Sequence, residues 1–163
     1  MRFESRVWKF GDHVDTDLII PGKFLNVSHK EELARNCFAD LRPDFVSRVK
    51  RGDVIVAGEN FGCGSSREQA PLALKGVGIS VIIAKSFARI FYRNAINIGL
   101  PLLESVDAAE VLTDGGRVSV NLATGEINNL ESGQRFFAKP IPDFMMEIIQ
   151  AGGVVPYIKR KRV

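Results

Sequence analysis

Short runs of Val and Ile alternate with amphipathic stretches in the middle of the chain. Residues 53–57 (DVIVA), 79–84 (ISVIIA) and 101–103 (PLL) are mainly apolar, a pattern that predicts buried strands. Between them, residues 68–75 and 86–96 carry apolar side chains at helical spacing and predict two helices. Strands that alternate with helices over short links indicate a parallel sheet with right-handed crossovers.

The N-terminal third has a less regular pattern. Residues 6–10 (RVWKF) alternate and predict a strand, whereas residues 15–22 begin as an Asp-rich turn and stop at a Pro-Gly pair. Ser28 is a favourable N-cap for a helix over residues 30–38. Two glutamates also place negative charge in the first turn of this helix, where it suits the helix dipole. One more strand and one more helix are therefore expected here, and residues 42–45 (RPDF) are expected to form a loop that enters another short helical turn.

The last third changes to hairpin and helix patterns. Residues 118–122 (VSVNL) alternate, the chain turns at residues 123–126 (ATGE), and it is expected to return through Ile127. Residues 142–149 predict a final helix, closed by the glycine pair that follows. Because no repeat and no linker interrupts the chain, we expect a mixed α/β fold with added hairpins.

The composition is typical of a globular domain. Hydrophobic residues make up 45% and charged residues 25% of the chain, and residues 1–163 are long enough to form one domain with a single core. No apolar run approaches the roughly 20 residues that span a bilayer, and the N-terminus lacks the apolar region of a secretion signal. We therefore expect a cytoplasmic protein. Two cysteines without a disulfide framework agree with that compartment.

The net charge of +3 is small, and much of it lies in one C-terminal run. Residues 159–162 (KRKR) are expected to form a solvated tail, with a nucleic-acid contact as the alternative. Functions that need a large basic surface therefore have little support in this chain.

The residues that commonly bind metals are too few and too scattered to form a metal site. Cys37, Cys63, His13 and His29 show neither C-x-x-C nor H-x-x-x-H spacing. We expect that this chain alone binds no metal and no iron–sulfur cluster. We interpret Cys63 as a small loop residue rather than a ligand or a nucleophile.

Residues 62–68 (GCGSSRE) place two hydroxyls and a guanidinium between a predicted strand and a predicted helix. Glycines let the backbone approach a bound group, and a helix start offers unpaired N–H donors and a partial positive charge. The loop lacks the third glycine of a dinucleotide motif, the lysine of a P-loop and the G-x-S-x-G pattern of a hydrolase. These differences disfavour nucleotide binding and serine-hydrolase chemistry.

The same loop suits an anionic substrate that has a proton to lose. Arg67 offers a planar, permanently charged fork that pairs with a carboxylate. Ser65, stripped of water and facing N–H donors and positive charge, would act as an alkoxide base. Serine is otherwise far too weak a base, so this hypothesis requires strong local stabilisation of the oxyanion.

Three motifs in compact order carry a specific resemblance: residues 15–21 (DTDLIIP), 62–68 (GCGSSRE) and 84–94 (AKSFARIFYRN). Together they resemble the small subunits of 3-isopropylmalate dehydratase and homoaconitase, which are equivalent to the last, swivelling domain of aconitase. The resemblance runs over nearly the whole chain. It implies a swivelling β/β/α domain that docks on a separate large subunit. It also implies a hydro-lyase whose [4Fe–4S] cluster, a Lewis acid, is bound by that large subunit.

The resemblance also implies roles for individual residues. By motif position, Ser65 would be the base and Arg67 would clamp a substrate carboxylate, while Ser66 would support the anion site. Asp17 and Gly64 would lie behind these groups, with turn formation as the alternative role for Asp17.

Residues 84–94 are interpreted as support for the serine loop. Ser86 is expected to cap a helix, Lys85 and Arg89 to be surface charges, and Arg93 to face the substrate only as a less favoured alternative. The apolar side chains of this segment are predicted to lie in the core: Phe87, Ile90 and Phe91.

In the resembled family, substrate choice is associated with the loop after the Asp-rich motif. Homoaconitase small subunits commonly have Tyr-Leu-Arg-Thr there, and the Arg meets the extra carboxylate of a longer acid. The aligned residues here are Phe24, Leu25, Asn26 and Val27, which carry no charge. The resemblance therefore favours isopropylmalate, converted between its 2- and 3-hydroxy isomers in leucine biosynthesis. Lys23 lies close enough to replace the Arg, so homoaconitate, citramalate and 2,3-dimethylmalate stay as alternatives.

Two readings from other classes are also open. The basic C-terminal run would suit an RNA-binding or regulatory module, although no aromatic-basic RNA motif accompanies it. The anion loop would also suit a carboxylate-binding protein without catalysis. The first predicts RNA affinity that depends on residues 159–163, and the second predicts no cluster-bearing partner.

Overall fold

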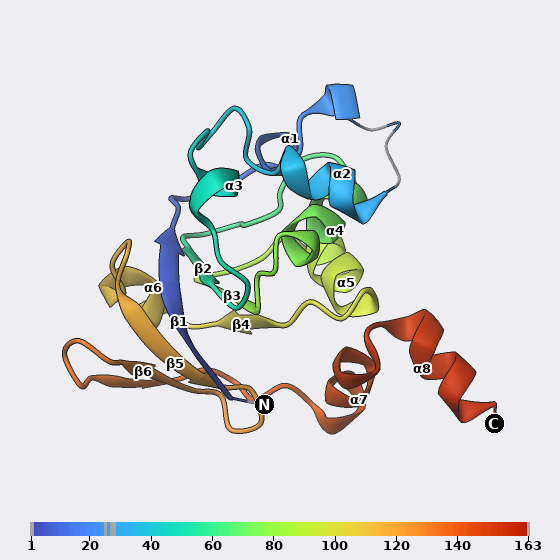
Figure 1. Cartoon of the computed structure of the whole chain (residues 1–163). Helices are drawn as coiled ribbons and strands as arrows, with labels where there is room; N and C mark the ends of the chain where they lie inside the picture. Colours follow the sequence, from blue (N-terminus) through green and yellow to red (C-terminus); the bar gives the residue numbers. More distant parts are fainter. Residues whose placement is uncertain (1, 25, 27–28, 163) are drawn as a thin grey trace.

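A seven-stranded mixed sheet forms the centre of the computed structural model, which describes residues 2–24, 26 and 29–162 (Figure 1). The strand order is β4-β3-β2-β1-β5-β6-β7. The strands are β1 (Arg2–Lys9), β2 (Val54–Ala57), β3 (Val81–Ala84), β4 (Leu102–Glu104), β5 (Arg117–Asn121), β6 (Glu126–Asn129) and β7 (Arg135–Phe137).

The helices connect and cover these strands. They are α1 (Thr16–Ile19), the 3-10 turn η1 (Gly22–Phe24), α2 (Lys30–Arg35), α3 (Phe45–Arg48), α4 (Gln69–Gly76), α5 (Arg89–Asn97), α6 (Val106–Val111), α7 (Asp143–Ala151) and α8 (Val154–Lys161). None of the helices in the described part of the chain is long and apolar enough to cross a membrane.

Strand β1 joins two differently built halves of the sheet. On one side it runs parallel to β2, and β2, β3 and β4 continue in parallel, as the alternation of strands and helices predicts. On the other side it pairs antiparallel with β5, which continues into β6 and β7. The parallel α/β centre and the added hairpin are therefore both confirmed.

Both faces of the parallel strands are buried. Ile55 and Ile82 point to one face, where they pack with helices α1 to α5, whereas Val54 and Val81 point to the other, where α6, α7 and the antiparallel strands cover them. Strands buried on both faces need no polar alternation. This is why the middle of the chain reads as continuous apolar runs.

The sequence patterns miss several short elements, among them α1 and η1, and misplace two helix ends. Helix α5 begins at Arg89 rather than at residue 86. Helix α2 ends at Arg35 rather than at residue 38, and the N-cap predicted at Ser28 lies outside the described residues. Helix α6, strand β7 and helix α8 were not predicted. The run at residues 159–162 is exposed, as expected of a solvated tail, but it is helical: Lys159, Arg160 and Lys161 form the last turn of α8, where positive charge suits the helix dipole.

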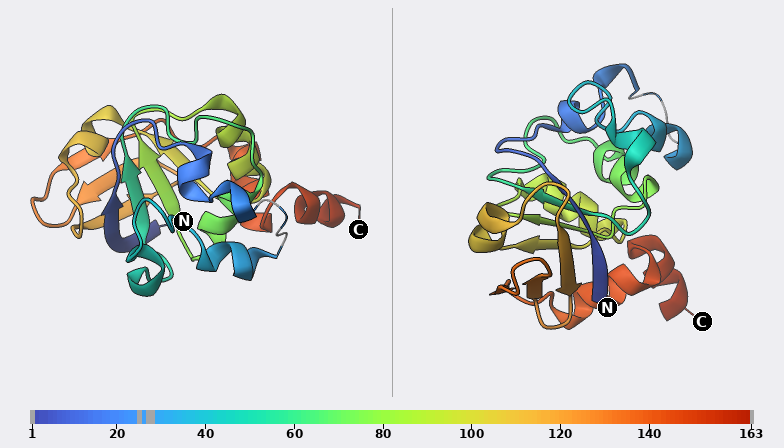
Figure 2. Two further views of the ribbon diagram at one scale, coloured as in Figure 1. Left: turned by 90° about the horizontal axis from the view of Figure 1, so that it is seen from above. Right: turned by 60° about the vertical axis from the view of Figure 1, so that its left-hand side comes forward.

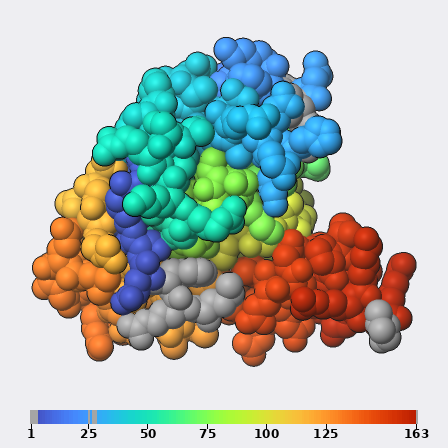
Figure 3. Space-filling model, viewed as in Figure 1, coloured from blue at the N-terminus to red at the C-terminus, as the bar shows by residue number. Residues whose placement is uncertain are grey.

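The C-terminal helices form a separate ridge at one side of the molecule. Figure 3 shows α7 and α8 as a lobe below the segment that carries α1 and α2, and α8 projects from the body in every view of Figures 1 and 2. Val155 and Ile158 of α8 are exposed. The predicted site lies on a different part of the molecule, between the loops that follow the parallel strands.

Candidate active site

Three loops that follow β1, β2 and β3 lie side by side. Isolated parallel bridges pair Asp15 with Cys63 and Phe61 with Phe87, so the strand pairing of the sheet continues past the ends of its strands. The backbone N–H of Gly62 donates to the carbonyl of Val14 over 2.8 Å. The carboxyl ends of parallel strands meet at one edge of a sheet, which is where open α/β sheets bind ligands.

Thr16 fastens the serine loop to the first of these segments. Its hydroxyl donates to the carbonyl of Ser65 over 2.8 Å, and its backbone N–H donates to the carbonyl of Cys63 over 2.8 Å. The side chains of Ser65 and Ser66 are exposed, just before α4 begins. Within the described residues, the Ser65 hydroxyl has no hydrogen-bond partner. The loop therefore presents this hydroxyl outward on a fixed backbone.

Gly64 allows the loop to pass directly over Asp15. Its φ is +88°, a conformation that side chains rarely adopt, and an added Cβ would lie 2.7 Å from the Asp15 Cγ. The Asp15 carboxylate itself accepts the N–H of Asp17 over 2.7 Å and caps α1. Gly64 therefore brings the serine loop into close contact with Asp15, whose carboxylate caps α1.

Replacing Gly64 by alanine is expected to lower the free energy of unfolding by about 2–3 kcal/mol, since strained φ and steric overlap add. Chemical denaturation measures this change. Gly133→Ala is the matched control, because Gly133 has a φ of +80° but nothing within 4 Å of an added Cβ. Equal losses for the two variants would contradict the close approach of Gly64 to Asp15.

Arg67 is tied to Asp17 across 50 positions of sequence. Its Nη1 donates to the Asp17 carboxylate over 2.7 Å and to the carbonyl of Ile20 over 3.3 Å. Asp17 also accepts the N–H of Gly22 over 2.9 Å. The hydrogen bond from Arg67, followed by that from Gly22, holds the pKa of Asp17 below its ordinary value. Asp17 thus fixes the direction of the guanidinium.

A pocket of about 180 Å³ brings the predicted residues together. The serine loop supplies one wall with Ser65, Ser66 and Arg67, and the start of α5 supplies the other. Helix α5 begins at Arg89, with Ala88 at the N-cap position; no described side chain caps it, and its first turn has no acidic residue. Its unpaired N–H groups and dipole therefore favour negative charge at this wall.

The chain is similar to known proteins over nearly its whole length. Residues 43–106 match the Aconitase C-terminal domain family. Over 158 residues the chain is 56% identical to the isopropylmalate/citramalate isomerase small subunit of Methanocaldococcus jannaschii, covering 97% of this chain and 94% of that protein. It is also 56% identical to the 3-isopropylmalate dehydratase small subunit of Caldanaerobacter subterraneus, covering 97% and 98% of the two chains. The chain belongs to the family of 3-isopropylmalate dehydratase small subunits.

The fold agrees with this family. The crystal structure of 3-isopropylmalate dehydratase from Methanocaldococcus jannaschii matches with a TM-score of 0.94 and 48% identity, covering 99% of this chain and 96% of that one. The expected aconitase-like α/β fold and the membership of a lyase family are therefore confirmed. The roles of single residues stay predictions.

The loop expected to select the substrate in this family is only partly described. Phe24 is half-buried against the core, Asn26 is exposed, and Leu25 and Val27 lie outside the described residues. Lys23 is exposed and its Nζ lies 5.3 Å from the centre of the Phe24 ring. Within the described part of the chain, Lys23 is not among the residues that line the pocket with Ser65.

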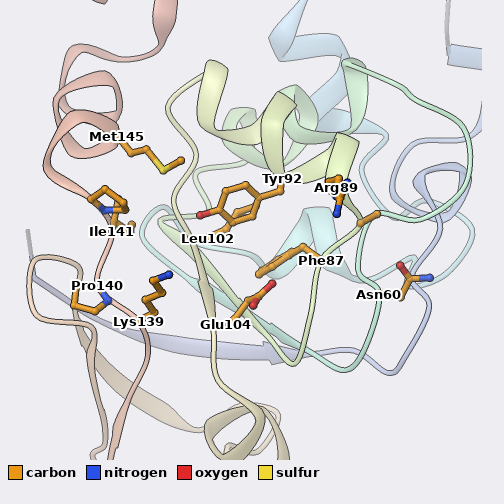
Figure 4. A pocket seen from close by; sticks show the side chains of 12 residues that line it. Asn60, Phe87, Arg89, Tyr92, Leu102, Glu104, Lys139, Pro140, Ile141 and Met145 are labelled. Atoms are coloured by element: carbon orange, nitrogen blue, oxygen red, sulfur yellow. The ribbon is translucent and has the colours of Figure 1, made fainter.

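A larger cavity of about 650 Å³ adjoins the serine pocket and shares Ala88 and Arg89 with it. It runs between α5 and the segment that leads into α7. Figure 4 shows Arg89 and Phe87 at one end, with Lys139 and Met145 across the cavity from them. Burial and the charge of Glu104 raise the pKa of Tyr92 in its wall, so the phenol keeps its proton at neutral pH.

The two cysteines behave as structural residues. Burial raises the pKa of the Cys37 thiol, and burial together with the charge of Asp15 raises the pKa of Cys63. A protonated thiol is a poor nucleophile, which agrees with the interpretation of Cys63 as a loop residue. Across residues 2–24, 26 and 29–162, no three His, Cys, Asp or Glu side chains are grouped to hold a metal ion.

The segment at residues 84–94 contributes more to the site than its sequence indicates. Ile90, predicted as core, is 52% exposed and lines the serine pocket together with Arg89 and Asn94. Ser86 does not cap α5, since its hydroxyl accepts the N–H of Asn60 over 2.8 Å. The order of the elements could have indicated this, because residues 84–94 follow β3, the strand next to β2. The loop after β3 therefore lies beside the serine loop, which follows β2.

Proposed function

We propose that the chain is the small subunit of a 3-isopropylmalate dehydratase, which interconverts 2- and 3-isopropylmalate in leucine biosynthesis. One observation supports this most: a chain that matches such subunits over nearly its whole length presents Ser65 beside Arg67 in one open pocket. Residues 1–163 act as one swivelling domain in this proposal, which closes the serine pocket over the substrate.

Ser65 is the base of the proposed reaction. As an alkoxide it takes the proton from the carbon next to the carbon that bears the hydroxyl, and the hydroxyl group leaves with a second proton as water. Adding water back across the double bond with the opposite orientation moves the hydroxyl to the neighbouring carbon. No net oxidation occurs, so the site needs an acid and a base but no electron carrier.

The exposed position of Ser65 supports this role. Its backbone carbonyl is held by Thr16, while its hydroxyl is unpaired among the described residues and faces a pocket with a helix N-terminus in the opposite wall. Closing the pocket would remove water from this hydroxyl and strengthen its interaction with the nearby positive groups. Both effects are needed for serine to act as a base.

Arg67 clamps one substrate carboxylate in this proposal. Asp17 and Ile20 engage its Nη1, which leaves Nε and Nη2 for a two-point contact with a carboxylate. Ser66 supports the same anion from the adjacent position. Lys23 belongs to the neighbouring loop and would reach the substrate only from the rim.

The other half of the site lies on a partner. Small subunits imply a large one, and we place a [4Fe–4S] cluster there, where it supplies the Lewis acid for the leaving hydroxyl. In this chain Cys37 is buried and Cys63 stands alone in its loop, so the residues present do not fit the cluster. A cytoplasmic location is part of the proposal and is supported by the two free thiols.

Citramalate is the second candidate substrate, because the name of the Methanocaldococcus jannaschii relative includes it. The two acids differ in the alkyl group on the carbon chain. The described part of the specificity loop carries no cation that lines the serine pocket, which disfavours the longer, more highly charged homoaconitate.

Anaerobic assembly of this chain with a cluster-bearing large subunit is expected to produce isopropylmalate isomerisation that neither chain shows alone. Isopropylmalate, citramalate, 2,3-dimethylmalate and homoaconitate are assayed side by side by the absorbance of the unsaturated intermediate. Turnover by this chain without a partner would contradict the proposal. Deleting residues 159–163 is expected to leave activity intact, and RNA affinity lost on that deletion would favour the RNA-binding alternative.

A further inference from the structure

Arg89 lies at the mouth of the serine pocket and is a cation without a partner among the residues that the structure describes. It is the first residue of α5, and its side chain is exposed and lines the pocket that holds Ser65 and Arg67. Its guanidinium forms no ion pair and no side-chain hydrogen bond with any described residue. The other arginine that lines this pocket, Arg67, is paired with Asp17 at 2.7 Å.

The charges behind the serine loop make an unpaired cation necessary for an anionic ligand. Asp17 compensates the charge of Arg67, and Asp15 lies against Gly64 under the same loop. Two carboxylates, Asp15 and Asp17, therefore lie close behind the guanidinium and backbone of the serine loop, although neither carboxylate lines the pocket itself. With the charge of Arg67 compensated by Asp17, this wall offers a substrate with two carboxylates no net positive charge, and like charges repel strongly where water is excluded.

On the opposite wall, Arg89 adds a positive charge that no described carboxylate compensates. Among the described residues that line the pocket, Arg67 and Arg89 are the charged ones, and Arg89 is the one without a carboxylate. The pocket also lies at the uncapped start of α5, which adds a partial positive charge on the same side. Asn94, one turn further on, offers an amide to the same space.

We propose that Arg89 binds a second carboxylate of the substrate, opposite the carboxylate held by Arg67. The inference rests on the proposed function for the identity of the substrate as a dicarboxylic hydroxy acid. In this proposal, each of the two carboxylates of the substrate is bound by a different wall of the same pocket. The serine loop then holds the end next to the base, and α5 holds the other end.

Arg93 provides a matched comparison within the same helix. It is four residues further along α5, is also exposed, and also lacks an ion pair within the described part of the chain. It lines a third pocket, of about 320 Å³ between α5 and α7, which Arg89 also borders, but it does not line the serine pocket. Removing either arginine changes the net charge of the protein equally, so only the position relative to Ser65 differs.

The first test measures carboxylate binding by the full chain without its partner. The ¹⁵N-labelled wild type, Arg89→Gln and Arg93→Gln are titrated with succinate, and with isobutyrate as a monocarboxylate of similar size, at constant ionic strength. The expected result is that succinate shifts the amide signals of the serine loop and α5. The dissociation constant should rise about tenfold in Arg89→Gln and remain unchanged in Arg93→Gln. The same spectra show whether each variant is folded.

The second test uses the assembled enzyme. Arg89→Gln is expected to raise KM for isopropylmalate about tenfold with a smaller change in kcat, and Arg93→Gln is expected to leave both unchanged. Affinity for the large subunit, measured by titrating it against the small subunit, is expected to be the same for all three proteins.

Three results would overturn the assignment. One is succinate binding that Arg89→Gln does not weaken, and another is a wild type whose pocket signals do not respond to succinate. The third is an Arg89→Gln variant that binds the large subunit less tightly at unchanged KM, which would make Arg89 an interface residue. Because the titration needs no turnover, it decides the role of Arg89 even if the assembled protein proves inactive on isopropylmalate.

Discussion

Ser65→Ala reduces turnover of the assembled enzyme by two to four orders of magnitude if Ser65 is the base, since a positioned acid or base contributes about 10²–10⁴ to the rate. The variant loses only the hydroxyl oxygen. The anchoring bond from Thr16 goes to the Ser65 backbone carbonyl and survives the substitution. The loop and the substrate contacts should therefore persist, so kcat falls while KM changes little.

Two measurements accompany this variant. Unfolding by heat is expected to match the wild type, because the exposed hydroxyl has no partner among the described residues. Ser47→Ala, an exposed serine on α3 far from the loop in sequence, is the control and should keep full activity. A Ser65→Ala enzyme with more than about a tenth of wild-type kcat would exclude Ser65 as the base.

Arg67→Lys is expected to raise KM for isopropylmalate roughly 10- to 100-fold, as hydrogen bonds to charged groups contribute about 1.5–3 kcal/mol each. A lysine keeps the charge and can still reach Asp17, but an ammonium cannot bridge both oxygens of a carboxylate. It also cannot keep the contact to Ile20 and bind the substrate in the same geometry. Steady-state kinetics of the assembled enzyme measure the effect.

Arg48→Lys is the control for that substitution. Arg48 is an exposed residue of α3 whose Nη1 lies 3.5 Å from the Asp44 carboxylate, and exposed pairs of this kind contribute little. Its kinetics should equal those of the wild type. An Arg67→Lys enzyme with wild-type KM would move the carboxylate site away from the serine loop and would leave Asp17 with a structural role only.

The parallel centre of the fold was predictable because its strands are buried on both faces. Residues such as Val54 and Ile55 form a continuous apolar run, which is typical of a strand buried on both faces. The two helices between the strands carry clear apolar stripes. The missed elements lack that signal. Strand β7 has three residues, two of them exposed, and α8 has no buried residue and a proline in its first turn.

The part of the candidate site that lies within one sequence motif was predictable. The part that depends on contacts between segments far apart in the chain was not. Ser65 and Arg67 are adjacent in a glycine loop whose residue types already indicate an anion site. The pairing of Arg67 with Asp17 depends on two loops that are far apart in the chain, and only the family resemblance placed them together. The position of the first turn of α5 beside the serine loop follows from the order of the strands, which the spacing of motifs alone does not give.

The central position of β1 also shapes how the protein is made. The four parallel strands are complete once Glu104 has been synthesised, but the outer edge of β1 waits for β5, which ends at Asn121. At ribosomal rates this interval lasts on the order of one to three seconds. During it the nascent chain carries an open strand edge, the type of surface that templates aggregation. Chaperone demand should therefore peak just before the hairpin emerges.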